Sequence, residues 1–179
     1  MITSMCNSYK HTIVITNRHL VQGDFLKQLE KVTKLHPHAL ILREKDLTDD
    51  AYESLAKKVF DLCEREDITF FLHTKIEIAR KIGCQNIHLS IPVLKGLSET
   101  EKKALTEDFC EISISCHSME DVEIAMAGGA TQIILGTIFE TECKKGVLGK
   151  GVEFVREICQ KCPLPVYAIG GMNMQRLPL

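Results

Sequence analysis

The amino-acid sequence predicts an α/β protein, a TIM-type (β/α)8 barrel that is truncated before its eighth strand and helix. The first observation is an alternation of short β-rich runs with amphipathic stretches of helical period, which is typical of a parallel sheet covered by helices. The second is the presence of seven such runs, because doubly wound sheets usually have only about five or six strands. The third is the C-terminal sequence VYAIGGMNMQRLPL, which offers neither a seventh full helix nor an eighth strand.

The predicted strands are short runs rich in apolar residues, bounded by polar residues or glycine. They are Thr12–Thr16, Ala39–Arg43, Thr69–His73, Asn86–Ser90, Glu111–His117, Gln132–Phe139 and Pro165–Gly170.

The predicted helices begin at capping residues. TDDAYESLAKKVFDLCERED starts with Thr48 as a cap and acids in the first turn, and it places Tyr52, Val59 and Leu62 on one face. SETE at Ser98 and SMED at Ser118 are capping-box starts for two more helices.

Composition indicates one soluble globular domain over residues 1–179. Apolar residues make up 45% and charged residues 26%, and the net charge of -2 argues against nucleic-acid binding. No signal peptide or membrane-spanning run is present in the sequence, so we expect a cytoplasmic protein with no membrane partner and eight reduced cysteines. Cys159 and Cys162 form a single Cys-x-x-Cys pair, which lacks the second pair of a structural zinc site.

Polar residues follow the predicted strands, at the end where (β/α)-barrels carry their functional groups. Alternation along EISISCH places Ser113, Ser115 and His117 on one face, and alternation along LILREK does the same for Arg43 and Lys45. We therefore expect His117, Arg43 and Lys45 to point into the barrel mouth.

Each of these candidates has a functional and a structural interpretation. His117 could exchange protons at neutral pH or be structural. Arg43 and Lys45 could bind a carboxylate or phosphate, or form salt bridges to Glu44 or Asp46 on the rim. The double glycine Gly170–Gly171 could let backbone amides approach a phosphate, or form a plain tight turn.

Four segments resemble the thiamine-phosphate-synthase superfamily of (β/α)8 barrels. They are LREK, IHLS, SISCHSMEDVEIAMAGGATQIILGTIFETECKKGVLGKGVEFV and PVYAIGGM. The resemblance runs from about Thr12 to Met172 and is closest to the TenI branch, the thiazole tautomerases.

For the synthase branch, the resemblance implies Mg²⁺-dependent joining of a pyrimidine diphosphate to a thiazole phosphate. That branch carries an Asn-Asp pair after the third strand and an aspartate after the fourth. The matching positions here are His73, Thr74 and Val93. Magnesium prefers carboxylate and other oxygen ligands, so these departures argue against synthase activity.

For the tautomerase branch, the resemblance implies aromatisation of a thiazole carboxylate phosphate, with one proton removed and one delivered and with no cofactor. The residue roles that it implies are proton shuttling by His117, carboxylate binding by Arg43 and Lys45, loop closure by Thr141 and Lys144, and phosphate binding by Gly170 and Gly171.

We therefore predict a cofactor-independent isomerase of thiamine biosynthesis that holds no metal and binds a small thiazole phosphate. Two alternatives remain open. One is a Mg²⁺-dependent thiamine phosphate synthase, and the other is a protein without catalytic activity that binds thiazole phosphate or has a regulatory role. An open seven-stranded barrel leaves backbone groups unpaired at its edges, which predicts a homo-oligomer, specifically a dimer.

Overall fold

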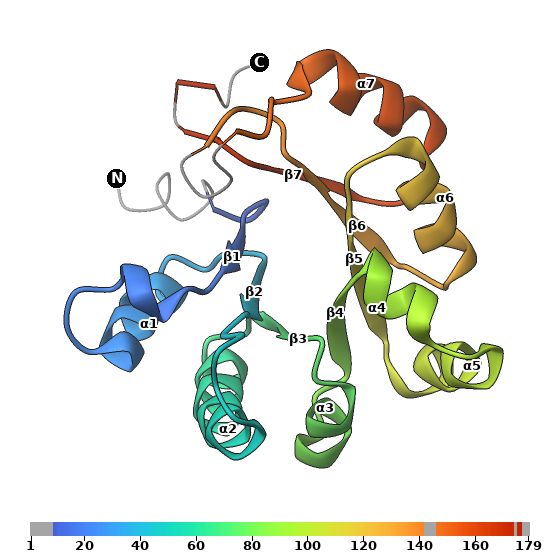
Figure 1. The fold of residues 1–179 in the computed structure, drawn as a ribbon. Coiled ribbons are helices and arrows are strands. Elements are labelled where there is room, and N and C mark those ends of the chain that lie inside the picture. The colour runs from blue at the N-terminus through green and yellow to red at the C-terminus, as the bar shows by residue number, and fades with distance from the viewer. Residues whose placement is uncertain (1–8, 142–145, 174, 177–179) are drawn as a thin grey trace. The chain divides into compact units, whose positions relative to one another are not determined.

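The structure is a computed structural model that describes residues 9–141, 146–173 and 175–176. Its contacts divide the chain into two compact units, Met1–His88 and Leu89–Leu179, which are described one after the other (Figure 1). The prediction of a single domain over residues 1–179 stays a prediction.

The first unit is a parallel sheet with strand order β1–β2–β3–β4. Helix α2 packs on β2 and β3, and it also contacts α1 and α3. In chain order the elements are β1 (Ile13–Ile15), η1 (Arg18–Leu20), α1 (Phe25–Thr33), β2 (Ala39–Leu42), α2 (Asp49–Arg65), β3 (Thr69–His73), α3 (Ile76–Ile82) and the first residues of β4 (Asn86–Ser90).

Helix α2 forms as its sequence predicts. The Thr48 hydroxyl accepts a hydrogen bond from the Ala51 amide, and Asp49 and Asp50 place negative charge in the first turn, where the helix dipole favours it. Its buried face includes Tyr52, Val59 and Leu62. All four residues of β2 are buried, as expected for a strand covered on both faces.

The hydroxyl of Tyr52 connects the ends of β2 and β3. It donates to the Leu42 carbonyl at 2.6 Å and accepts from the His73 amide at 3.2 Å. Tyr52 is 1% exposed, so no water can replace the hydroxyl at either group.

Replacing Tyr52 with phenylalanine is therefore expected to lower the free energy of unfolding by about 1–3 kcal/mol, because a buried N–H and a buried C=O lose their shared partner. Urea unfolding followed by circular dichroism measures the change. The control is Tyr9→Phe, at an exposed position, which should stay within about 0.5 kcal/mol of the parent protein. Equal effects of the two substitutions would contradict the bridging role.

The second unit contains a parallel sheet with strand order β5–β6–β7. Helices α4 and α6 pack on β5 and on each other. After the last two residues of β4, its elements are α4 (Ile91–Gly96), α5 (Glu99–Asp108), β5 (Glu111–Cys116), α6 (Met119–Ala127), β6 (Gln132–Gly136), α7 (Gly151–Lys161) and β7 (Val166–Ile169).

The two predicted capping boxes have different outcomes. Ser98 and Glu101 form a complete box at the start of α5. Ser118 caps α6 by accepting from the Asp121 amide, but the Asp121 carboxylate binds the amide of His117 at 2.7 Å. The acid therefore fixes the backbone of the residue that precedes the cap.

Beyond β7, the described residues form no further helix or strand. Ile169, the last residue of β7, is 41% exposed. No helix in the described part of the chain has both the length and the apolar composition needed to cross a membrane. Every cysteine in that part is a free thiol, including Cys159 and Cys162 at the C-terminal end of α7.

Candidate functional site

Polar groups gather at the carboxyl ends of the strands in the first unit. Arg43 and Lys45 follow β2, and His73 ends β3. The charges of Arg43 and Lys45 are close enough to the His73 imidazole to lower its pKa, in addition to the effect of burial. The structure thus brings together the predicted cationic pair and a histidine that the resemblance placed at a metal-ligand position.

Glu44, between the two cations, is buried and organises this end of the sheet. Its carboxylate accepts from the Thr16 hydroxyl at 2.7 Å, from the Arg18 amide at 3.1 Å and from the Arg18 guanidinium at 3.2 Å. The Thr16 hydroxyl oxygen in turn accepts from the Arg43 amide at 2.9 Å. The backbone of Arg43 is therefore fixed by a network that joins the ends of β1 and β2.

The acids beside Arg43 and Lys45 are committed to other cations. Glu44 pairs with Arg18, and Asp46 pairs with Arg18 and with His19. The hydrogen bond from Arg18 keeps the pKa of Asp46 below its usual range. Among the described residues, no carboxylate pairs with Arg43 or Lys45. The predicted alternative of rim salt bridges to Glu44 or Asp46 is wrong, and two positive charges remain to meet an anion.

His73 and His88 are two buried imidazoles at the ends of β3 and β4. Their ring centroids lie 5.6 Å apart. Burial, and then the charges of Arg43 and Lys45, lower the pKa of His73 to about 4. Burial, then His73 and Arg43, lower the pKa of His88 to about 3. Both rings are neutral at pH 7, so they serve as hydrogen-bonding groups beside the cations.

These two histidines predict a loss of stability in acid. In the unfolded chain both imidazoles titrate near pH 6.5, whereas in the folded protein they stay neutral to about pH 4 and 3. Between these values the unfolded state binds more protons. The free energy of unfolding therefore falls as the pH decreases from about 6.5 towards 4, by up to about 1.4 kcal/mol per pH unit for each histidine.

Urea unfolding at a series of pH values between 7.5 and 4.5 measures this slope. His73→Asn should flatten it, whereas His36→Gln, at an exposed position, should leave it unchanged. A slope that stays the same in His73→Asn would show that the acid sensitivity has another origin.

Thr74 has a backbone conformation that threonine rarely adopts. Its φ angle is 63°, in the left-handed region that asparagine and aspartate tolerate better than β-branched residues. Its amide donates to the His88 carbonyl at 2.9 Å, and its hydroxyl donates to the His73 carbonyl at 2.7 Å. The hydroxyl is thus used to stabilise the turn itself.

The residues at the family's magnesium positions do not fit that ion. His73 is a buried imidazole, Thr74 uses its hydroxyl on the backbone, and the side chain of Val93 has no ligand atom. Magnesium needs oxygen ligands, usually with at least one carboxylate. The part of the chain that the structure describes contains no group of three or more His, Cys, Asp or Glu residues able to hold a metal.

In the second unit, His117 follows β5 and its side chain is 50% exposed. Its backbone is held on both sides, because its amide donates to Asp121 and its carbonyl accepts from Lys150. Lys150 also lies over the Phe154 ring, with its Nζ 4.7 Å from the centroid. The imidazole Nδ1 lies 3.8 Å from the Asp121 carboxylate.

Gly170 and Gly171 form a turn packed tightly on the segment that follows β6. Their φ angles are 104° and 62°. A Cβ at Gly170 would lie 2.6 Å from Thr137 Cγ2, and one at Gly171 would lie 2.5 Å from the Glu140 carbonyl oxygen. Glycine is required at both positions, because a side chain would push two backbone segments apart.

Of the predicted loop residues, Thr141 is half-buried shortly after β6. Lys144 lies outside the described residues. Sequence reasoning missed Glu44 as an organising group, and it missed Arg176, whose guanidinium donates to the Gly171 carbonyl. The alternation that placed Arg43 and Lys45 on one face already implied an opposite face for Glu44.

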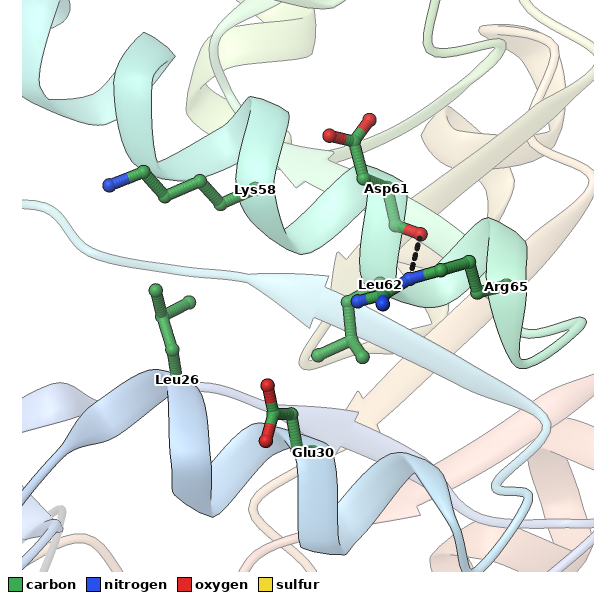
Figure 2. Close-up of a pocket in the computed structure, with 6 residues that line it drawn as sticks. All are labelled: Leu26, Glu30, Lys58, Asp61, Leu62 and Arg65. Atoms are coloured by element: carbon green, nitrogen blue, oxygen red, sulfur yellow. Dashed lines mark hydrogen bonds between the residues drawn. The ribbon is translucent and has the colours of Figure 1, made fainter.

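A shallow hollow between α1 and α2 is lined by Leu26, Glu30, Lys58, Asp61, Leu62 and Arg65 (Figure 2). Arg65 donates from Nε to the Asp61 carbonyl at 3.3 Å. Four of the six lining residues carry charges of both signs, and none is a histidine, cysteine or serine. The hollow lies against the helices rather than at the strand ends, so we do not assign it a function.

The family profile and the relatives found by sequence agree on one family. The profile of the family described as thiamine monophosphate synthase matches residues 12–179. A thiamine-phosphate synthase of Clostridium acetobutylicum is 30% identical, covering 92% of this chain and 77% of that protein. One from Coprothermobacter proteolyticus is 29% identical, covering 90% of this chain and 75% of that protein.

The solved structure of thiamine phosphate pyrophosphorylase from Pyrococcus furiosus matches with a TM-score of 0.77 and 23% identity, covering 92% of this chain and 77% of that one. This likeness confirms the predicted fold class, a TIM-type barrel with seven of its strands in the described chain.

The prediction of an isomerase is wrong. The relatives are named thiamine-phosphate synthase, which is a transferase. The sequence motifs behind the prediction identified the family, but the names of the relatives do not support the branch that the prediction chose.

Proposed function

Because the chain belongs to the thiamine monophosphate synthase family, we propose that it is a transferase that joins a pyrimidine diphosphate to a thiazole phosphate. In this reaction the thiazole nitrogen forms a bond to the pyrimidine methylene carbon, the carbon–oxygen bond to the diphosphate breaks, and diphosphate leaves with the bonding electrons. The names of the relatives support this reaction class.

The observation that carries the proposal is the pair of positive charges at the strand ends of the first unit. Arg43 and Lys45 have no carboxylate partner in the described chain, and the histidine beside them is neutral. A diphosphate would supply the missing negative charge, since guanidinium and ammonium groups bind phosphate oxygens with short, strong hydrogen bonds. The Thr16–Glu44 network supports this role, because it fixes the Arg43 backbone before any ligand arrives.

In the second unit, we assign the thiazole phosphate to the turn at Gly170 and Gly171. Backbone amides at such a turn can approach an anion closely. His117 is our candidate for a contact to the ligand, since its imidazole is half-exposed and its backbone is fixed. Thr141 and Lys144 are candidates for contacts to the ligand from the segment after β6.

A second candidate function is binding of thiazole phosphate without turnover. The donor set at His73, Thr74 and Val93 favours it, because it does not fit the magnesium of the synthase branch. In this case the cationic pair and the glycine turn would bind anions, and no coupling would follow.

One experiment separates the two functions. The protein is incubated with both substrates in the absence and in the presence of Mg²⁺, and thiamine phosphate and released diphosphate are quantified by chromatography. Equal amounts of the two products, lost in Arg43→Gln, support the transferase. Thiazole phosphate binding in calorimetry without any product supports the binding function, and neither binding nor product refutes both.

A further inference from the structure

The segment after β7 folds back on the glycine turn. The Asn173 side-chain oxygen accepts from the amides of Gln175 and Arg176 at 3.1 and 3.2 Å, and the Asn173 carbonyl accepts from the Arg176 amide at 3.0 Å. This turn directs the guanidinium of Arg176 to Gly171, where Nη1 donates to the carbonyl at 2.6 Å.

A second contact fixes the direction of the Arg176 side chain. The guanidinium carbon lies 4.5 Å from the centroid of the Phe139 ring, within the range of a cation–π interaction. Phe139 is also joined to the turn through its amide, which donates to the Gly170 carbonyl at 2.9 Å. The guanidinium of Arg176 is thus held by two contacts, one to the Gly171 carbonyl and one to the Phe139 ring.

Within the residues that the structure describes, no acid compensates the charge of Arg176. No other charged residue occurs between Cys162 and Leu179, and no carboxylate in the described chain pairs with Arg176. A guanidinium has five N–H donors in a planar fork, and the structure shows one of its nitrogens bound to a carbonyl. Donors therefore remain for a ligand.

The backbone beside the guanidinium also contains hydrogen-bond donors. Within the described residues, the amides of Gly171 and Met172 have no hydrogen-bond acceptor. The Met172 amide belongs to the same trans peptide as the Gly171 carbonyl, so it points away from the guanidinium. The Gly171 amide and the other guanidinium nitrogens are the donors at this turn that a phosphate could meet.

We infer that Arg176 is a phosphate-binding residue, which holds the phosphate of the ligand at the turn of Gly170 and Gly171. This inference rests on the proposed function only for the identity of the ligand. Arg176 then gives the site its preference for a phosphorylated thiazole over the corresponding alcohol, because the alcohol has no negative charge for the guanidinium to meet.

Calorimetry tests the inference with three ligands: the thiazole phosphate, its dephosphorylated alcohol and inorganic phosphate. Arg176→Gln is expected to weaken binding of thiazole phosphate by about 10–100-fold, as for the loss of a charge-assisted hydrogen bond, and to leave binding of the alcohol unchanged. Arg176→Lys, which keeps the charge but loses the fork, should fall between the two. The matched control is Arg156→Gln, on the exposed face of α7, where the arginine pairs with Glu153.

Three results would overturn the inference. One is an unchanged preference for phosphate in Arg176→Gln. Another is equal weakening for phosphate and alcohol, which would indicate that Arg176 only maintains the turn. The third is a parent protein that binds neither thiazole phosphate nor inorganic phosphate. Because these measurements need no second substrate, failure of the coupling reaction leaves them intact, and the two proposals can fail separately.

Discussion

Replacing Glu44 with alanine is expected to lower the free energy of unfolding by about 2–4 kcal/mol. The Thr16 hydroxyl and the Arg18 amide would lose a charged acceptor, and the volume of a side chain that is 1% exposed would become a cavity. Because Thr16 also holds the Arg43 amide, we expect weaker diphosphate binding in the same variant.

The matched control for Glu44 is Asp46→Asn. Asp46 binds the same Arg18 side chain, but it is 51% exposed, and exposed ion pairs contribute at most about 1 kcal/mol. Urea unfolding gives both changes, and calorimetry with inorganic diphosphate gives the binding. Losses of similar size in the two variants would mean that the buried network has no special role in stability.

Replacing Gly170 with alanine is expected to weaken thiazole phosphate binding at least about tenfold. A Cβ at this position would lie 2.6 Å from Thr137 Cγ2 and 3.0 Å from Thr137 Cα, so the turn and the segment after β6 must separate. Alanine also resists a φ of 104°, which adds strain of about 1–3 kcal/mol. The amides that would bind phosphate move with the turn.

Gly23 provides a control that isolates the close approach from the dihedral angle. Its φ is 94°, and no atom lies within 4 Å of a Cβ built there. Gly23→Ala should therefore cost stability through φ alone and should leave phosphate binding intact, as measured by unfolding and calorimetry. Loss of phosphate binding in both variants would point to general destabilisation rather than to the turn.

Features set by neighbouring residues could be predicted from the sequence. Thr48 and Ser98 cap their helices as expected, because a cap depends on residues three positions away. The presence of the strands β1–β7 could also be predicted, because each forms from a short apolar run in the sequence. The end of β6 could not: the apolar run Gln132–Phe139 predicts eight strand residues, whereas β6 ends at Gly136. The residues after Gly136 pack against the turn at Gly170 instead of continuing the strand.

Features set by distant residues could not be predicted. Arg18 and Glu44 are 26 positions apart, and the pairing of an acid with one of several nearby cations depends on their positions in space. The cationic pair was found because Arg43 and Lys45 are two positions apart in the sequence, directly after the run that forms β2. Arg176 was not found, since only the folding back of the last described segment brings it to Gly171.

The left-handed turn at Thr74 has a consequence for engineering. The backbone there already has the shape that aspartate or asparagine accepts more readily than threonine. An aspartate could therefore be introduced without rebuilding the loop, and the substitution would relieve local strain while supplying a carboxylate oxygen at the edge of the strands. A single substitution at Thr74 would therefore add a possible cation ligand on a backbone that already suits it.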